Sequence, residues 1–194
     1  MSTTVPIKDK EALDTFRNFY LKEGDYRNYA LIVTGLNTAL RIGDILSLKW
    51  ENVYNFSNNV FLKHIDLIEH KTRRNSSIAM NNAIISALEL LMEHLDKQEL
   101  MPQRHIFTGQ KNPNAPISRS QAFRIVKKAA KAAGMNHNVS CHSLRKTFGY
   151  YAYKSVTSSV MLMNIYNHSS FQVTKRYLGV DQDERDAVFL STEL

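Results

Sequence analysis

Hydrophobic residues recur every three to four positions near the start of the chain, a period typical of amphipathic helices. Leu13, Phe16 and Tyr20 fall on one face of a helix expected over residues 9–22. The same spacing continues through residues 26–37. We therefore expect the chain to begin with two helices, each burying one face.

The segment that follows, TALRIGDILSLKW, interrupts this period at Gly43. Asp44 can cap a short helix over Ile45–Leu48, because a carboxylate accepts hydrogen bonds from the unpaired N–H groups of a first helical turn. Arg41 then lies at a turn beside a helix start, where side chains converge on ligands. An arginine whose stem covers the core and whose guanidinium is solvated fits the segment equally well.

Short β-like runs replace the helical period between residues 58 and 80. NNVFLKHIDLIE and SSIAM predict two strands around the polar turn HKTRRNS, which is the pattern of a β-hairpin. Lys71, Arg73 and Arg74 lie near its tip, where cations are either simply solvated or, in a DNA-binding protein, close to a phosphate. A strand near Val53–Phe56 would complete a small three-stranded antiparallel sheet.

The helical period returns in the second half of the chain. Helices are expected over residues 82–96, from Ser118 to Gly134, over 143–154, over 158–166 and around Tyr177, with an acidic helix at the end. We expect Phe123 to face the core and the Met-rich helix over 158–166 to be buried. The predicted fold class is mixed and mainly α, with a small antiparallel sheet.

Length and composition favour a single domain. The chain has 194 residues, 43% hydrophobic and 22% charged, as in ordinary globular proteins. No apolar run approaches the ~20 residues that cross a bilayer, and the first residues lack the apolar segment of a signal peptide. The single cysteine, Cys141, excludes an internal disulfide and a cysteine-based zinc cluster, and it agrees with a reducing cytoplasm.

Charge is distributed unevenly along the chain. The net formal charge is +7, but residues 181–194 hold five acidic side chains and one basic side chain. Residues 1–180 are left with 24 basic and 13 acidic side chains, a net charge of +11. A body this basic suggests a polyanionic partner such as DNA, although surface charge also serves solubility alone. One predicted helix carries a cationic strip that we interpret as a nucleic-acid face: Arg124, Lys127, Lys128 and Lys131.

Residues 140–180 hold much of the candidate chemistry, and several classes of site are excluded. The sequence has no glycine-rich phosphate loop, no acids and histidines at metal-ligand spacing, and no G-x-S-x-G nucleophile elbow. We therefore expect neither a metal nor a cofactor.

The remaining residue types suit phosphoryl transfer from a DNA diester without a metal. Two arginines can hold the non-bridging oxygens. A lysine can give a proton to the departing 5′-oxygen, a histidine can accept the tyrosine proton, and the tyrosine can hold phosphorus covalently. Each residue alone is a weak indication, so the interpretation rests on their order and spacing. The set comprises two arginines, two histidines, one lysine and one tyrosine.

These segments resemble the catalytic domain of tyrosine recombinases of the phage-integrase type. TALRIGDILSLKW is similar to the family's first box, with Arg41 as its arginine, and EHKTRRNSSIAM is similar to its β-hairpin, with Lys71 as its lysine. CHSLRKTFGYYAY resembles the H-x-x-R box, and NHSSFQVTKRYLG resembles the box that ends in the tyrosine.

Two positions depart from the family pattern. Asp44 stands where most members have glutamate, and we expect it still to orient Arg41. Tyr166 and Asn167 precede His168 where most relatives have Leu-Gly, a change that touches backbone flexibility and no catalytic group.

The resemblance implies the tyrosine-recombinase fold and a mechanism. Tyr177 would attack the scissile phosphate and leave a 3′-phosphotyrosyl bond and a free 5′-hydroxyl. Lys71 would protonate the leaving oxygen, and His142 would act as the base toward Tyr177. The phosphate would be bound by Arg41, Arg145 and His168.

It also implies an assembly. Four protomers would exchange two pairs of strands of double-stranded DNA through a Holliday junction, while the protein alone could be a monomer. Residues 1–180 would form one catalytic domain, and the tail helix within 181–194 would dock on a neighbouring protomer or, equally, on its own domain. The N-terminal domain with which relatives clamp DNA is expected to be absent, because Arg41 lies so near Met1.

The expected function is site-specific recombination, such as the integration or excision of a mobile element, on the nucleoid of a cytoplasm. Two alternatives stay open. One is strand relaxation like that of a type IB topoisomerase, which shares the chemistry. The other is a DNA-binding accessory protein that has lost catalysis.

Overall fold

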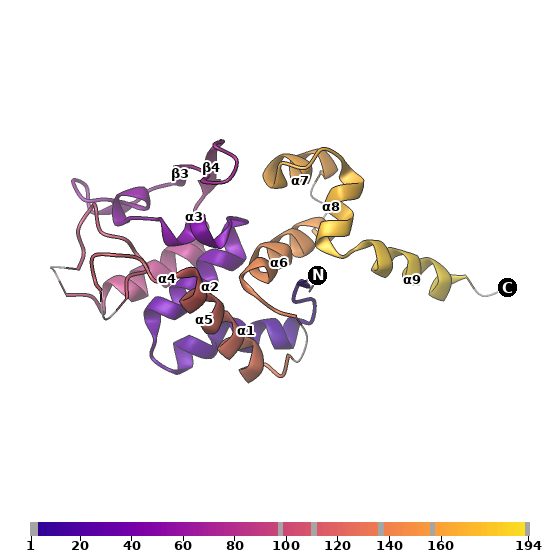
Figure 1. Ribbon diagram of the computed structural model, residues 1–194, viewed down its shortest axis with the longest axis horizontal. Helices are drawn as coiled ribbons and strands as arrows, with labels where there is room; N and C mark the ends of the chain where they lie inside the picture. Colours follow the sequence, from indigo (N-terminus) through magenta and orange to yellow (C-terminus); the bar gives the residue numbers. More distant parts are fainter. Residues whose placement is uncertain (1–3, 97–98, 110–111, 136–137, 156–157, 193–194) are drawn as a thin grey trace.

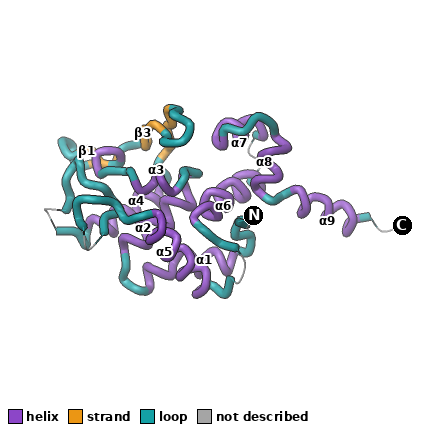
Figure 2. The backbone as a smooth tube through the Cα atoms, viewed as in Figure 1, coloured by secondary structure: helices purple, strands orange, loops and turns teal. Residues whose placement is uncertain are grey.

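A computed structural model describes residues 4–96, 99–109, 112–135, 138–155 and 158–192. Over these ranges the chain forms nine α-helices, one 3-10 turn and four short strands (Figures 1 and 2). The helices are α1 (Lys10–Lys22), α2 (Tyr26–Thr38), α3 (Ile42–Leu46), α4 (Asn82–Met92), α5 (Arg119–Ala132), α6 (Cys141–Lys154), α7 (Ser159–Tyr166), α8 (Phe171–Leu178) and α9 (Asp181–Ser191). The mainly helical fold class is confirmed.

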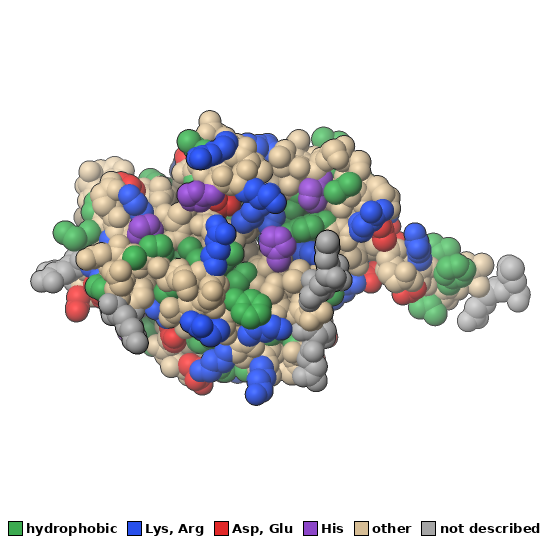
Figure 3. Space-filling model, in the orientation of Figure 1, with side chains coloured by type: hydrophobic (Ala, Val, Ile, Leu, Met, Phe, Trp, Pro, Cys, Tyr) green, Lys and Arg blue, Asp and Glu red, His purple; other side chains and the backbone are tan. Residues whose placement is uncertain are grey.

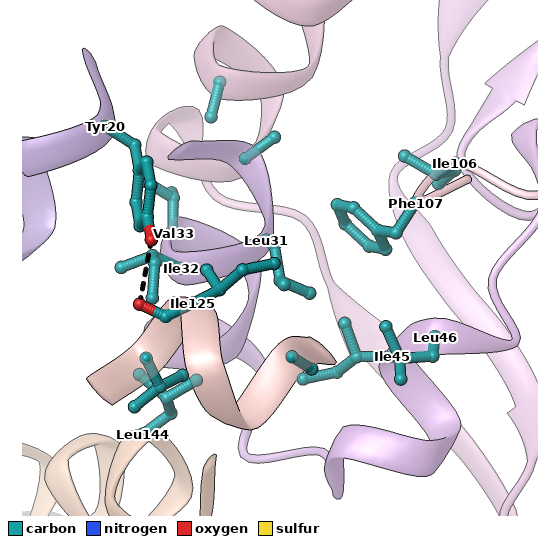
Figure 4. Packing of buried hydrophobic residues seen from close by; sticks show 14 of the residues in the cluster. Tyr20, Leu31, Ile32, Val33, Ile45, Leu46, Ile106, Phe107, Ile125 and Leu144 are labelled. Carbon is teal, nitrogen blue, oxygen red and sulfur yellow. Dashed lines mark hydrogen bonds between the residues drawn. The ribbon is translucent and has the colours of Figure 1, made fainter. Parts of the chain in front are cut away.

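Helix α2 lies at the centre of the main hydrophobic core and packs against α1, α4 and α6. Leu31, Ile32 and Val33 are three consecutive buried residues, so this helix is covered on more than one side (Figure 4). The hydroxyl of Tyr20 donates a hydrogen bond of 3.0 Å to the carbonyl of Ile125, which ties α1 to α5. Loss of hydration raises the pKa of the Tyr20 phenol to about 12, so it remains a donor at neutral pH.

The predicted three-stranded sheet is wrong in its pairing. The described residues form two separate two-stranded sheets: β1 (Tyr54–Asn55) with β2 (Val60–Phe61), and β3 (His64–Ile68) with β4 (Asn75–Ala79). The segment predicted as one strand, residues 58–69, instead forms hydrogen bonds to two different parts of the chain. The N–H of Leu62 donates to Val53, whereas the carbonyl of Lys63 accepts from Met80.

Two buried faces were also predicted incorrectly. Phe123 is 44% exposed, because α5 turns Ala122, Ile125 and Val126 to the core and Phe123 to the opposite side. Helix α7 buries Leu162 and Tyr166, one turn apart, and leaves Met161 exposed.

A second, smaller cluster joins α6, α7 and α8. Leu162, Tyr166 and Leu178 are fully buried in it. Gly149 of α6 makes this packing possible: a Cβ there would lie 2.4 Å from both the Tyr166 hydroxyl and Leu178. The glycine therefore sets how closely α8, which carries Tyr177, approaches α6.

Helix α9 projects away from the body at the end of the molecule opposite β1 and β2 (Figure 1). Its start is tied down, because Glu184 pairs with Lys175 of α8 and accepts a hydrogen bond from Tyr153 of α6. Its far end carries three exposed apolar side chains, Val188, Phe189 and Leu190. None of the described helices has both the length and the apolar character that crossing a membrane requires.

Candidate active site

Arg41 and Glu69 form the first half of the candidate site. Arg41 is the residue that immediately precedes α3, and its Nη1 donates to Oε2 of Glu69 at the end of β3. The Glu69 side chain is only 9% exposed and also accepts hydrogen bonds from Thr72 and Ser76. Burial tends to raise the pKa of Glu69, but the Ser76 bond and the Arg41 charge outweigh it and hold the pKa below its usual value.

Asp44 has a different place from the predicted one. It lies inside α3 rather than capping it, is 1% exposed, and its Oδ1 accepts the backbone N–H of His70 at 2.9 Å. The acid that contacts Arg41 is Glu69, whereas Asp44 anchors the turn of the hairpin. The two carboxylates together fix Arg41 and the start of the segment that carries Lys71.

Arg145 forms the second half of the site. It lies on α6, which begins after the capping residue Ser140, and it is only 4% exposed. Its guanidinium donates to the carbonyl of Ala39 and lies 4.6 Å from the ring centroid of Tyr166. Ala39 has a left-handed backbone with φ of 54°, which ends α2 just before Arg41. One loop therefore contacts Arg145 and carries Arg41.

Tyr177, on α8, is docked among the other candidate residues. Its ring centroid lies 5.2 Å from that of His168 and 6.2 Å from that of His142. Its hydroxyl is buried close to the guanidinium of Arg145. Burial raises the pKa of the Tyr177 phenol, and the nearby guanidinium of Arg145, then that of Arg41, opposes the rise.

The two histidines are held toward their neutral form. Loss of hydration, followed by the charge of Arg145, lowers the pKa of both His142 and His168. Nδ1 of His168 lies 3.1 Å from the hydroxyl of Thr174, which is fully buried and fixes the ring. A neutral imidazole can accept a proton, as general-base catalysis requires.

Lys71 lies on the exposed turn between β3 and β4 and borders an open cleft. The cleft has a volume of about 340 Å³. Its lining includes Arg41, Gly43, Asp44, His70, Lys71, Arg119 and His142. Lys71 is thus brought to the same cleft as Arg41 and His142, on a turn that the Asp44–His70 hydrogen bond holds.

Figure 3 shows Lys, Arg and His side chains close together on the face between α3 and α6, with further Lys and Arg side chains over α5. Arg124, Lys127 and Lys131 lie on the exposed side of α5. Lys128 is exposed as well, but it leans toward α1, where it pairs with Glu23 at 3.8 Å.

The two arginines of the hairpin differ from each other. Arg73 lies in the turn with φ of 54° and is exposed. Arg74 donates to the carbonyl of Asn164 at 2.7 Å, so it links the hairpin to α7.

Two residues that support the site, Glu69 and Tyr166, were not predicted from the sequence. Glu69 stands directly before His70 and Lys71, and an acid within such a cationic turn was a usable signal for an internal ion pair. Tyr166 donates its hydroxyl to the carbonyl of Arg145, and its ring faces the Arg145 guanidinium. Across the described ranges, no three His, Cys, Asp or Glu side chains are grouped as metal ligands would be.

Comparison with protein families gives a match over residues 8–184 to the model described as the phage integrase family. The chain is 33% identical over 191 residues to the probable integrase/recombinase YoeC of Bacillus subtilis, with 97% of each chain covered. It is 23% identical over 178 residues to the tyrosine recombinase XerH of Campylobacter jejuni, covering 90% of this chain and 47% of that protein. The chain thus spans nearly the whole of YoeC and about half of XerH.

Solved structures share the fold at lower identity. XerA recombinase has a TM-score of 0.71 at 19% identity, over 99% of this chain and 65% of that one. XerH bound to a palindromic difH substrate, in a post-cleavage complex, has a TM-score of 0.72 at 19% identity, over 96% of this chain and 53% of that one. A lambda integrase dimer bound to a COC′ core site has a TM-score of 0.65 at 17% identity, over 92% of this chain and 60% of that one.

The match to the family model covers all of the described segments that carry the candidate residues. The chain belongs to the phage integrase family, the tyrosine recombinases.

Proposed function

We propose that this protein is a site-specific DNA recombinase that cleaves and rejoins strands through a 3′-phosphotyrosine intermediate. The observation that carries the proposal is the position of Tyr177. Its buried hydroxyl lies near Arg145, and its ring contacts those of His142 and His168. The guanidinium of Arg145 beside this hydroxyl favours its anionic form, which is the form that attacks phosphorus.

The scissile phosphate would be bound by two arginines and one histidine. Arg41 and Arg145 would hold the non-bridging oxygens, as planar guanidinium groups do well, and His168 would donate a further hydrogen bond. Glu69 and the carbonyl of Ala39 fix the two guanidinium groups in advance, so little reorganisation is needed when charge develops.

In the chemical step, the Tyr177 oxygen forms a bond to phosphorus while the bond from phosphorus to the 5′-oxygen breaks. The phenolic proton passes to His142, and Lys71 supplies a proton to the departing 5′-oxygen. The phosphodiester is exchanged for a phosphotyrosine, so the reverse step rejoins DNA without ATP. No metal or cofactor has a role in this scheme.

The proposed partner is double-stranded DNA. The XerH and lambda integrase structures named above are complexes with their own DNA sites. For this chain, the contacting side chains would be those of the exposed face of α5 and of the hairpin tip: Arg73, Arg74, Arg124, Lys127, Lys128 and Lys131. The reaction would then take place on the nucleoid in the cytoplasm.

Strand exchange would involve four protomers and a Holliday junction. In this arrangement α9 would dock on a neighbouring protomer, through the exposed Val188, Phe189 and Leu190. The catalytic domain would comprise residues 1–180, and the tail would serve assembly.

A nicked suicide substrate tests the proposal, because the short strand beyond the scissile phosphate is lost after cleavage and the covalent complex accumulates. The wild-type protein should form this complex, and Tyr177→Phe should form none while binding DNA as before. Binding without any covalent complex in the wild-type protein would leave only the role of accessory DNA-binding protein.

A second measurement separates recombination from relaxation. The protein should recombine two copies of its cognate site and should not relax supercoiled plasmids that lack the site. Relaxation of any plasmid, without exchange between sites, would identify a type IB topoisomerase-like activity instead.

A further inference from the structure

Arg119 is a cation in the catalytic cleft that neither the family motifs nor the proposed mechanism uses. It is the first residue of α5, is exposed, and lines the same cleft as Arg41, Lys71 and His142. Within the part of the chain that the structure describes, no hydrogen bond or ion pair engages its guanidinium. Arg41 and Arg145, in contrast, already donate to Glu69 and Ala39.

The guanidinium of Arg119 lies directly over the backbone of α3. A Cβ at Gly43 would come within 2.7 Å of Nη2 of Arg119. The absence of a side chain at Gly43 thus lets Arg119 lie against the helix turn that follows Arg41. This contact brings the end of a long, flexible side chain to one wall of the cleft.

The position of Tyr177 indicates which part of the DNA would enter the cleft. In an in-line displacement, the attacking and leaving oxygens lie on opposite sides of phosphorus. Tyr177 packs against His142, His168 and Tyr166 and is not among the residues that line the cleft. Lys71, the proposed donor to the 5′-oxygen, does line it. His142 and Arg41 line the cleft as well, so it extends from the reacting phosphate toward the leaving-group side, where Lys71 and Arg119 lie.

Building on the proposed function, we propose that Arg119 binds the first phosphate of the strand that carries the leaving 5′-oxygen. It would hold the freed 5′-hydroxyl end beside the phosphotyrosine and so favour rejoining over loss of the strand. Arg119 acts here as a positioning residue, since it touches the neighbouring phosphate rather than the reacting one.

The test uses the wild-type protein trapped as a covalent complex on a suicide substrate. A strand with a free 5′-hydroxyl is then added at increasing concentration, and the rate of rejoining is measured. Arg119→Ala should raise the half-saturating strand concentration by at least about tenfold, as expected for the loss of a charge-assisted hydrogen bond. Its rate of covalent complex formation should fall by a smaller factor, because the uncleaved strand is also held by its covalent continuity with the scissile phosphate.

A modified strand identifies the phosphate. A neutral methylphosphonate at the first phosphate should weaken rejoining by the wild-type protein as much as Arg119→Ala does. It should cause no further loss in Arg119→Ala, because the two changes remove the same interaction. The control is Arg124→Ala on the exposed face of the same helix, outside the cleft, which should keep the full methylphosphonate effect.

Two results would overturn the assignment even if the wild-type protein cleaves DNA covalently. One is unchanged rejoining by Arg119→Ala. The other is a loss in Arg119→Ala with the methylphosphonate strand that equals the product of the two separate losses. A wild-type protein that forms no covalent complex would instead refute the proposed function and this inference with it.

Discussion

Two buried carboxylates hold Arg41 and the hairpin turn that carries Lys71. Glu69 pairs with Arg41, and Asp44 accepts the backbone N–H of His70 at the start of the hairpin turn. Buried charges are stable only when they are paired and hydrogen-bonded, and Glu69 meets this condition through Arg41, Thr72 and Ser76. The guanidinium of Arg41 is consequently restrained before any phosphate arrives.

Glu69→Gln should therefore weaken catalysis more than DNA binding. The amide can still accept from Ser76 but no longer holds Arg41 by charge, so the guanidinium becomes less well placed. We expect covalent complex formation to slow by about 10- to 100-fold, the size expected from a misplaced catalytic group. Single-turnover cleavage and a DNA-binding titration measure the two effects. Equal losses in both measurements would contradict a positioning role.

Lys71 provides a test of the leaving-group side of the site. Lys71→Ala should slow cleavage by about 10²–10⁴-fold, the usual contribution of a general acid. A substrate with sulfur in place of the 5′-bridging oxygen should restore most of that rate, because a thiol with a pKa of about 8.5 departs without a proton. Arg73→Ala, a neighbour in the same turn, should show no such rescue. A sulfur substrate that Lys71→Ala cleaves no faster would remove the lysine from this role.

The lowered pKa values of His142 and His168 predict how stability depends on pH. A histidine with a folded pKa below its ordinary value of 6.5 binds fewer protons in the folded state than in the unfolded state. Its contribution is complete above pH 6.5 and is lost as the pH falls from there toward the folded pKa. We therefore expect the free energy of unfolding to decrease on acidification through this window.

Urea unfolding at several pH values measures this dependence. The double variant His142→Gln and His168→Gln should have a shallower slope between about pH 7 and pH 5 than the wild type. Glu69 does not contribute to this slope. Its pKa lies below the ordinary value of 4.5, so the stability that its ionised form provides is lost only at pH values below 4.5. An identical slope in the two proteins would show that the histidines are not held neutral.

At the scale of elements, the sequence predicted the hairpin and most helices. It did not predict which strands pair in a sheet. The hairpin around Lys71 followed from β-rich runs on either side of a polar turn, which are local signals. The break at Leu62 and Lys63 depends on which distant backbone groups each residue meets, and no local pattern contains this. Asp44 was read as a cap for the same reason: its partner, His70, is distant in sequence.

The contact between α6, α7 and α8 is likewise a tertiary feature, and Gly149 tests it. Gly149→Ala places a methyl group 2.4 Å from both the Tyr166 hydroxyl and Leu178. Overpacking of this kind costs about 1–3 kcal/mol in unfolding free energy, and the displaced α8 should also slow cleavage by Tyr177. Urea unfolding and suicide-substrate cleavage measure the two effects.

Gly109→Ala is the matched control, since its nearest neighbour would be Ile117 at 3.8 Å and its φ is not positive. This variant should be close to wild type in both measurements. A Gly149→Ala protein as stable and active as Gly109→Ala would show that α6 and α8 are not held this close.

At the scale of the whole molecule, the sequence indicated the distribution of charge and six candidate residues, whereas the groups that hold those residues depend on the fold. Arg41, Lys71 and Tyr177 were indicated by segments that resemble the family's motifs. Glu69 lies in the hairpin segment and Arg119 outside all of these segments, and the roles of both depend on the fold that brings β3 and α5 to α3. The separation of a basic body from an acidic tail was visible in composition, and the tail is an extended helix that leaves the body.

The exposed apolar end of α9 leads to a prediction about assembly. Val188, Phe189 and Leu190 are 63%, 79% and 81% exposed, an unusual exposure for three adjacent apolar residues. Burying such side chains in a neighbouring protomer would contribute about 1.5–3 kcal/mol each. The double variant Phe189→Ser and Leu190→Ser should thus weaken assembly on a DNA with two sites by at least about 100-fold.

Cleavage of a single suicide site should stay near the wild-type rate, because neither residue lies near Tyr177 in the described fold. Mass measurements of the protein–DNA complexes distinguish one, two and four bound protomers, and Arg185→Ala on the same helix is the control. If the tail instead folds back on its own domain, the double variant will lower the free energy of unfolding and leave the mass distribution unchanged.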